Sequence, residues 1–240
     1  MKEQKNTSPL KACLFRERKR YFSSSVYVMN TLVGYIMMIV VSVMLVFGDM
    51  SAVLTVIPAS FIVKLAPFVM AMLMNLSPTT VSAFSMEGKH FWLTQSLPVD
   101  AKTVVHAKLL MNLVFAIPSA LISSAVLLFA LRPTGPDILW LLLLPLVFAL
   151  FGTVTGLFIN IKMPMLNWTS ESMPVKQSKA VLVMMLISFA SAAIPLTIFF
   201  FIPSSFEHIY MLAVTVLFII LTSLLYRKLR AVRMNDLIER

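Results

Sequence analysis

Apolar residues dominate six long stretches of the chain, and shorter polar or charged segments separate them. A helix that rises about 1.5 Å per residue needs about 20 residues to cross roughly 30 Å of hydrocarbon. Each stretch is close to that length and is uniformly apolar rather than alternating, which is typical of helices and not of barrel strands. The pattern predicts an all-α membrane protein, a bundle of about six transmembrane helices near residues 26–47, 65–86, 109–131, 138–161, 180–202 and 209–226.

The composition supports lipid as the solvent for most of the chain. Of 240 residues, 59% are apolar and only 12% are charged, whereas soluble domains carry roughly 25% charged residues. We therefore expect residues 26–226 to form the six-span transmembrane domain. Residues 1–25 form a basic cytoplasmic or interfacial segment, and residues 227–240 form a basic cytoplasmic tail.

The distribution of basic residues predicts the orientation. All but two of the 20 Lys and Arg residues lie in the N-terminal segment, in the second and fourth connections, or in the tail. This count places Lys108 with the second connection, at the start of the third helix. Only Lys64 and Arg132 lie on the other side. Because basic loops stay in the cytoplasm, we expect both termini there, in a multi-pass protein of the cytoplasmic membrane, and the basic excess requires no nucleic acid.

The predicted spans carry few polar groups. No Asp, Glu, His, Lys or Arg falls in the middle of a span, whereas carriers driven by protons or sodium often place such groups there. Gly152 and Gly156 form a GxxxG pattern that predicts close helix packing. Milder polar residues are open to two interpretations, interhelical hydrogen bonds, which are the commoner role, or a substrate path. The candidates are Asn75, Thr79, Asn112 and Ser119.

The connection between the second and third spans contains a short amphipathic stretch. Glu87 and Gly88 end the second span, and Pro98 ends the stretch that follows. Asp100 stands where a residue that caps the third helix is expected. A short helix held between two spans could dock into a groove on a cytoplasmic partner and transmit force to both spans. The candidate coupling residues are Glu87, Gly88, Trp92, Leu93, Leu97, Pro98 and Asp100.

This segment, with its Glu-Gly, apolar and aromatic stretch, Leu-Pro, short polar step and a Lys at the next span (Lys108), resembles the coupling region of permeases of ATP-binding-cassette (ABC) exporters of the second type. Residues 16–25 (RERKRYFSSS) with Asn30 resemble the entry to such a permease. Residues 160–168 (NIKMPMLNW), Glu171 and 175–178 (VKQS) resemble a loop of large exporter permeases of Gram-positive bacteria. The chain is similar to their C-terminal six-span half. Those permeases commonly carry a re-entrant hairpin between the last two spans, for which residues 203–207 leave little room.

The resemblance implies a permease subunit or half that moves substrate by alternating access. Its partners would be a cytoplasmic cassette ATPase and a second six-span half, or another copy of the chain, within membrane lipid. The chain has no GxxxxGK[ST] phosphate loop, so we expect no cofactor in it and ATP on the partner. Two alternatives stay open, a non-transporting assembly or regulatory subunit and a secondary carrier.

An enzyme is disfavoured by the sequence. His90, His106 and His208 all lie near span ends, without the spacing of a metalloprotease or a partner for serine chemistry. Cys13 is the only cysteine, which excludes an internal disulfide and any multi-cysteine metal site. We therefore expect no catalytic, metal-binding or cofactor-binding residue.

Overall fold

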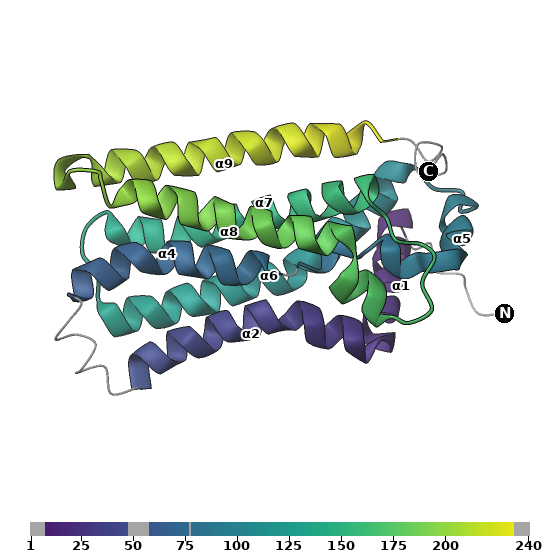
Figure 1. Cartoon of the computed structure of the whole chain (residues 1–240), viewed down its shortest axis with the longest axis horizontal. Coiled ribbons are helices and arrows are strands. Elements are labelled where there is room, and N and C mark those ends of the chain that lie inside the picture. Colours follow the sequence, from purple (N-terminus) through teal and green to yellow (C-terminus); the bar gives the residue numbers. More distant parts are fainter. Residues whose placement is uncertain (1–7, 48–57, 77, 233–240) are drawn as a thin grey trace.

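Five of the six predicted spans form single uninterrupted helices that run side by side along the bundle (Figure 1). The computed structural model describes residues 8–47, 58–76 and 78–232, and these contain no strand. Six helical stretches are long and apolar enough to cross a membrane, as the hydrophobic pattern predicts. The uninterrupted helices are α2 (Ser25–Phe47), α6 (Ala101–Leu131), α7 (Asp137–Lys162), α8 (Lys179–Phe199) and α9 (Glu207–Arg230).

The second span is broken, which corrects the expectation of one helix over residues 65–86. Helix α4 (Ala59–Asn75) ends early, and the chain continues through the 3₁₀ turns η1 (Thr79–Val81) and η2 (Ser85–His90) to the short helix α5 (Phe91–Gln95). Pro78 has no N–H with which to continue the helical ladder. The N–H of Thr79 instead donates to Asn112 Oδ1 at 2.7 Å, and the Thr79 carbonyl accepts from the Tyr27 hydroxyl at 2.5 Å. Hydrogen bonds to other helices thus replace the bonds that the break removes.

The third long helix begins at Ala101, earlier than the predicted start at residue 109. Asp100 occupies the N-cap position of α6, as predicted, but its side chain makes no capping hydrogen bond. The early start changes the position of Lys108, which we placed with the loop cations. It lies about two turns inside α6 and its side chain is fully buried.

Helix α7 is the centre of the bundle and packs against α4, α6, α8 and α9. Its glycines allow a close approach to the broken second span. A Cβ atom on Gly152 would lie 1.7 Å from Asn75 Oδ1, and one on Gly156 would lie 2.6 Å from Thr80 Oγ1. A side chain at either position would push the second span away from α7.

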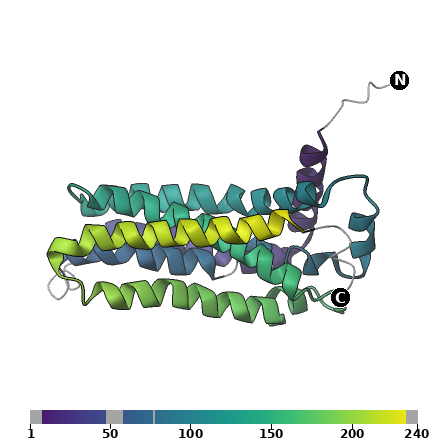
Figure 2. The ribbon, with the colours of Figure 1, turned by 90° about the horizontal axis from the view of Figure 1, so that it is seen from above.

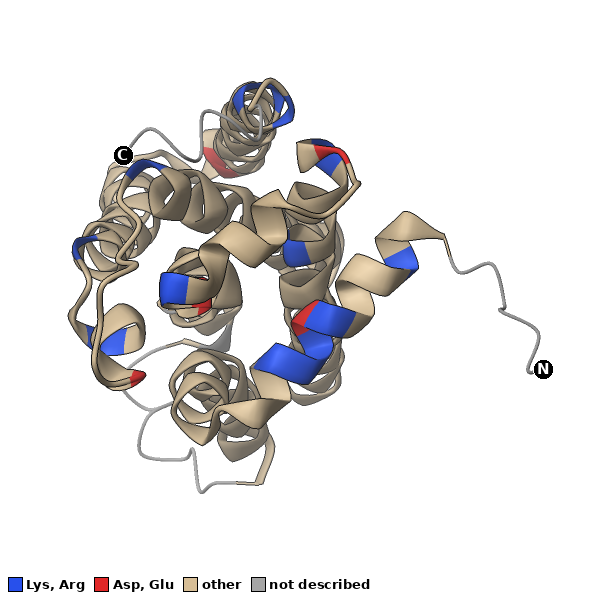
Figure 3. Cartoon of the chain, turned by 90° about the vertical axis from the view of Figure 1, so that its right-hand side faces the viewer, with Lys and Arg blue, Asp and Glu red and all other residues tan. Residues whose placement is uncertain are grey.

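Helix α1 (Pro9–Ser23) lies across one end of the bundle, at a steep angle to the long helices (Figure 2). The same end holds α5, the segment 163–178, which includes the helical turn η3 (Met173–Gln177), and the last turn of α9. We call it the basic end, because Lys and Arg gather there (Figure 3). The opposite end, which holds the turn η4 (Ser204–Phe206) between α8 and α9, is called the far end. Assignment of the basic end to the cytoplasm rests on the charge pattern.

Candidate functional site: a buried ion-pair cluster beside the exposed helix α5

Four charged side chains from three separate elements meet inside the basic end. Glu17 and Arg20 come from α1, Glu87 from η2 and Lys108 from α6. Lys108 Nζ lies 2.6 Å from Glu87 Oε1 and 3.0 Å from Glu17 Oε1. Arg20 Nη1 lies 2.9 Å from Glu87 Oε1 and 3.1 Å from Glu17 Oε1. These four residues form the ion-pair cluster, in which each cation contacts both carboxylates.

The cluster is desolvated and balanced in charge. The side chains of Lys108 and Glu87 are 0% and 1% exposed, and two cations face two anions. Lys108 Nζ also donates to the Ala83 carbonyl at 2.9 Å and lies 4.5 Å from the centre of the Phe84 ring. Burial of a charge costs several kcal/mol unless it is paired and hydrogen-bonded. The ion pairs and hydrogen bonds together therefore offset the free-energy cost of burying these charges.

Arg20 illustrates the electrostatic balance on the α1 side of the cluster. Burial by itself would lower the pKa of the guanidinium, because it disfavours the charged form. The carboxylates of Glu17 and Glu87 outweigh this effect, so the pKa of Arg20 is raised above its ordinary value. Arg20 thus stays charged and holds the two carboxylates together.

Thr94 connects the cluster to helix α5. Its hydroxyl donates to Glu87 Oε2, and it accepts from Arg16 Nη2 of α1 at 2.8 Å. Thr94 is buried, whereas Trp92 and Leu93 on the same short helix are 60% and 41% exposed. Helix α5 therefore presents an apolar outer surface and is held from within by Glu87 and α1.

The backbone that carries Glu87 is held by α7 and by the segment after it. Asn160 Oδ1 accepts from the N–H groups of Phe84 and Ser85, at 2.7 and 3.2 Å. Trp168 Nε1 donates to the Ser85 carbonyl at 2.7 Å. Gly88 has a φ of 54°, and a Cβ atom there would lie 3.0 Å from the Trp168 ring. Glycine suits this position because a side chain would be strained in its backbone conformation and would crowd the indole.

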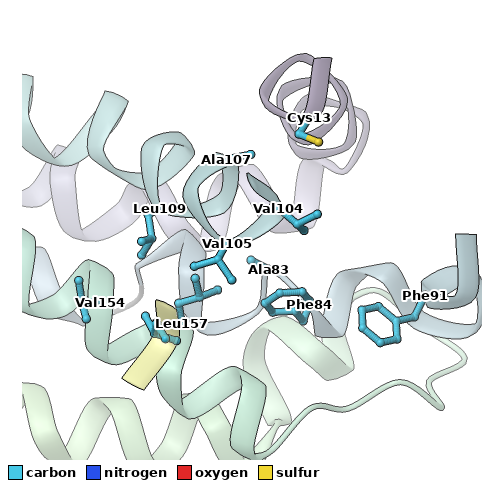
Figure 4. Packing of buried hydrophobic residues seen from close by; sticks show 11 residues of the cluster. Cys13, Ala83, Phe84, Phe91, Val104, Val105, Ala107, Leu109, Val154 and Leu157 are labelled. Carbon is cyan, nitrogen blue, oxygen red and sulfur yellow. The ribbon is translucent and has the colours of Figure 1, made fainter. Parts of the chain in front are cut away.

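A cluster of buried hydrophobic residues lies beside the ion-pair cluster (Figure 4), and Phe84, which Lys108 contacts, belongs to it. Phe84 and Phe91 pack edge to face, with ring centres 5.9 Å apart. Around them lie the buried residues Cys13, Ala83, Val104, Val105, Ala107, Leu109, Val154, Leu157 and Leu229. Because apolar side chains surround the buried pair of Lys108 and Glu87, the pair lies in a medium of low polarity that strengthens it.

The predicted coupling residues divide into two groups. Glu87 and Gly88 are buried, and Glu87 contacts α1 and α6. Trp92, Leu93, Pro98 and Asp100 are exposed, and Leu97 is half-buried. The segment therefore has an anchored part, which begins at Glu87, and an accessible part, which lies on α5 and the turn after it.

The structure brings two of the four candidates for a substrate path, Thr79 and Asn112, into direct contact. Thr79 and Asn112 are bonded directly, through the N–H and hydroxyl of Thr79, and Asn112 also contacts Tyr35 and Thr153 at 3.0 and 2.7 Å. Ser119 donates to the Phe115 carbonyl of its own helix. Asn75 is buried against Gly152, and its Nδ2 has no protein partner. We call Tyr35, Thr79, Asn112 and Thr153 the Asn112 network.

The three stretches that carry the resemblance meet at the basic end. Ser24 donates to Glu171 at 2.5 Å, and Asn30 Nδ2 donates to the Val175 carbonyl at 3.1 Å. Ser82, just before η2, donates to the Pro174 carbonyl at 2.9 Å. The segment 163–178 thus connects the start of α2 to the segment that carries Glu87.

Four residues with central contacts were given no individual role from the sequence: Glu17, Arg20, Lys108 and Asn160. Glu17 had a detectable signal, because it is the one acid in a basic run and stands three residues before Arg20, a spacing that places them on one helix face. Lys108 was hidden by the misplaced start of α6. Asn160 was noted only as the first residue of the stretch 160–168, and nothing in the sequence indicated that it would hold the backbone of residues 84 and 85.

Comparison of the chain with protein-family models, curated proteins and solved structures gives no match. Within the described ranges, no group of three or more His, Cys, Asp or Glu side chains could hold a metal ion. The ion-pair cluster is a set of charges that ties α1, α6 and the α5 segment together.

Proposed function

We propose that this chain is a transmembrane permease subunit, or half, of an ABC-type exporter, which moves substrate by alternating access driven by a separate ATPase. The proposal rests on one observation: the α5 segment is exposed on one side and is bonded to the ion-pair cluster on the other. Its outer side exposes Trp92 and Leu93, while Thr94 on its inner side is bonded to Glu87. A protein that pressed on α5 would act directly on the ion-pair cluster, and through it on α1 and α6.

The proposed mechanism uses the cluster as a rigid joint. Closure of the ATPase dimer displaces α5, and Thr94 and Glu87 transmit the displacement to Lys108 on α6 and to Arg20 on α1. The charges move together, since separating any of them would leave a buried charge unpaired. The break between α4 and η1 supplies a hinge, because few helical hydrogen bonds must be broken there. Substrate would pass as the long helices reopen toward the far end.

The partners follow from this mechanism. A cassette ATPase in the cytoplasm would bind the basic end and hold ATP, and this chain would hold no cofactor. A second six-span half, or another copy of this chain, would complete the path. The basic end then faces the cytoplasm, in agreement with the distribution of Lys and Arg.

A secondary carrier is the second candidate, because the second span is discontinuous. Carriers often form their binding sites where a helix is broken near the middle of the membrane. Here the break is lined by Asn112, whose Oδ1 accepts from the N–H of Thr79 at 2.7 Å. A carrier would transport without an ATPase, so the same experiment separates the two candidates.

The test is purification of the tagged chain from its native membrane in mild detergent, with identification of bound proteins by mass spectrometry. We expect a cassette ATPase to co-purify, and the double substitution Trp92→Ala with Leu93→Ala to reduce its recovery about tenfold or more, since large exposed apolar anchors dominate interfaces. Phe201→Ala is the matched control, because Phe201 is an exposed aromatic residue outside the basic end. Two results would contradict the proposal. One is equal ATPase recovery from the Trp92→Ala, Leu93→Ala double variant and from the Phe201→Ala control. The other is that no ATPase is recovered with the unaltered chain in several mild detergents.

A further inference from the structure

A groove of about 430 Å³ runs along the outside of the bundle, from its middle to the basic end. Helices α6 and α9 form its walls, α7 forms its floor, and Leu10 of α1 closes it at the basic end. Its size falls within the range of roughly 300–1,000 Å³ that is typical of ligand pockets. The groove is lined by Leu10, His106, Leu109, Leu110, Leu113, Leu150, Thr153, Val154, Thr222, Ser223 and Tyr226.

The interior of the groove is lined mainly by apolar side chains. The hydroxyls of Thr153 and Thr222 donate to carbonyls of their own helices at 2.6 Å, so neither is left without a partner. Leu110 and Leu150 are 37% and 43% exposed, so the groove is open along its side. An apolar ligand could therefore enter laterally, from the hydrocarbon of the membrane.

The two lining side chains with titratable groups, His106 and Tyr226, lie toward the basic end. There His106 Nε2 and the Tyr226 hydroxyl are 2.7 Å apart and bridge α6 and α9. Between His106 and Leu113 the groove extends about 10 Å along α6. One leaflet of hydrocarbon is about 15 Å thick, so a chain that entered from the basic end would reach well into its own leaflet.

Beyond the groove, toward the basic end, the two helices that form its walls carry basic residues. Lys102 stands four residues before His106, and Arg227 and Arg230 stand four residues after Ser223 and Tyr226. Residues four apart lie on one face of a helix, so these exposed cations lie in line with the lining residues. None of the three forms an ion pair with a carboxylate in the part of the chain that the structure describes. An anionic group at the mouth of the groove would meet three positive charges.

We propose that this groove binds one acyl chain of an anionic phospholipid, whose headgroup phosphate lies among Lys102, Arg227 and Arg230. The apolar lining selects the chain, and the line of cations selects the charge of the headgroup. The site is separate from the ion-pair cluster and from the exposed side of α5. It would exist whether or not an ATPase binds the chain.

The test is native mass spectrometry of the full-length protein in detergent, with phosphatidylglycerol or phosphatidylcholine of the same acyl chains added. We expect selective binding of one phosphatidylglycerol. Leu150→Trp and, separately, Leu110→Trp fill the groove and abolish this binding. Leu186→Trp is the control, because Leu186 is an exposed leucine of α8 outside the groove. Circular dichroism and the unfolding temperature establish that each variant is folded.

The charge is tested separately. Replacement of Lys102, Arg227 and Arg230 by Gln removes about 1 kcal/mol of attraction per cation, or about fivefold in affinity for each. The matched control is Lys89→Gln, Lys176→Gln and Lys179→Gln, which removes three exposed cations of the basic end outside the groove. Equal binding of the two lipids, or equal losses in test and control variants, would overturn the proposal. A dimer that Leu150→Trp dissociates would also overturn it, since the groove would then hold a second copy of the chain.

Discussion

The two ends of the bundle each carry ion pairs, but in very different surroundings. At the far end, Lys64 of α4 pairs with Glu207 of α9, and their side chains are 25% and 16% exposed. Lys108 and Glu87 in the ion-pair cluster at the basic end are almost inaccessible to water. Water can replace the lost partner of an exposed ion, whereas a buried ion has no substitute. We therefore expect burial, and not the number of pairs, to decide how strongly charges hold these elements together.

Removal of Lys108 is expected to have the largest effect. Lys108→Met retains an apolar stem but leaves Glu17 and Glu87 with Arg20 as their one basic partner in the cluster. Breaking a buried pair in this way typically costs about 3–5 kcal/mol. The measurement is the free energy of unfolding in mixed detergent micelles. The control Lys102→Met, at an exposed position of the same helix, should change it by less than about 0.5 kcal/mol.

A double substitution tests whether the loss comes from unpaired charge. Glu87→Gln added to Lys108→Met removes both members of the 2.6 Å pair and leaves Glu17 with Arg20. The combined loss should be smaller than the sum of the single losses, by about 0.5–3 kcal/mol, as for residues in one network. Additive losses would mean that Lys108 acts through packing and not through its charge.

Thr94 should have an intermediate effect. Thr94→Ala removes the hydroxyl that donates to Glu87 and accepts from Arg16. Hydrogen bonds to charged groups contribute about 1.5–3 kcal/mol, so the loss of unfolding free energy should fall in that range. Thr94→Ser keeps the hydroxyl and should recover most of it. Similar losses in both variants would exclude the hydrogen bonds as the cause.

The pair at the far end should contribute least to stability. Because solvent reaches both side chains, Glu207→Gln should lower the free energy of unfolding by less than about 1 kcal/mol. Added salt should weaken the pair further, since exposed charges are screened. A loss as large as that of Lys108→Met would refute the contrast between the two ends.

Cys13 reports on the packing around the cluster without a change in stability. Burial raises the pKa of its thiol, and the negative charge of Glu17 raises it further. A raised pKa lowers the thiolate fraction at pH 7, so alkylation by iodoacetamide should be slow and should increase with pH into the alkaline range. Ala12→Cys in a Cys13→Ser chain provides an exposed control thiol at the neighbouring position. Equal alkylation rates would show that Cys13 is not buried between α1 and the bundle in solution.

Much of the fold could be predicted, and the candidate site only in part. Five spans followed from hydrophobic length, because each apolar stretch must bury its backbone in a helix. The break after Asn75 could not be predicted from that pattern, since it depends on hydrogen bonds between Thr79 and the distant residues Asn112 and Tyr27. Glu87 was identified from its local motif. Its partners Glu17 and Lys108 lie 70 and 21 positions away in the chain, and that they pair with it followed only from the fold.

The sequence by itself determined that the chain is a helical bundle with long apolar helices and one end rich in Lys and Arg. These properties depend on the composition of each segment, so they can be derived segment by segment. Only the tertiary structure decided which charges are buried and paired, where the second span breaks and which part of the α5 segment is exposed. Each of these depends on contacts between residues far apart in the chain, where burial changes the free energy of a charge or a peptide group by several kcal/mol.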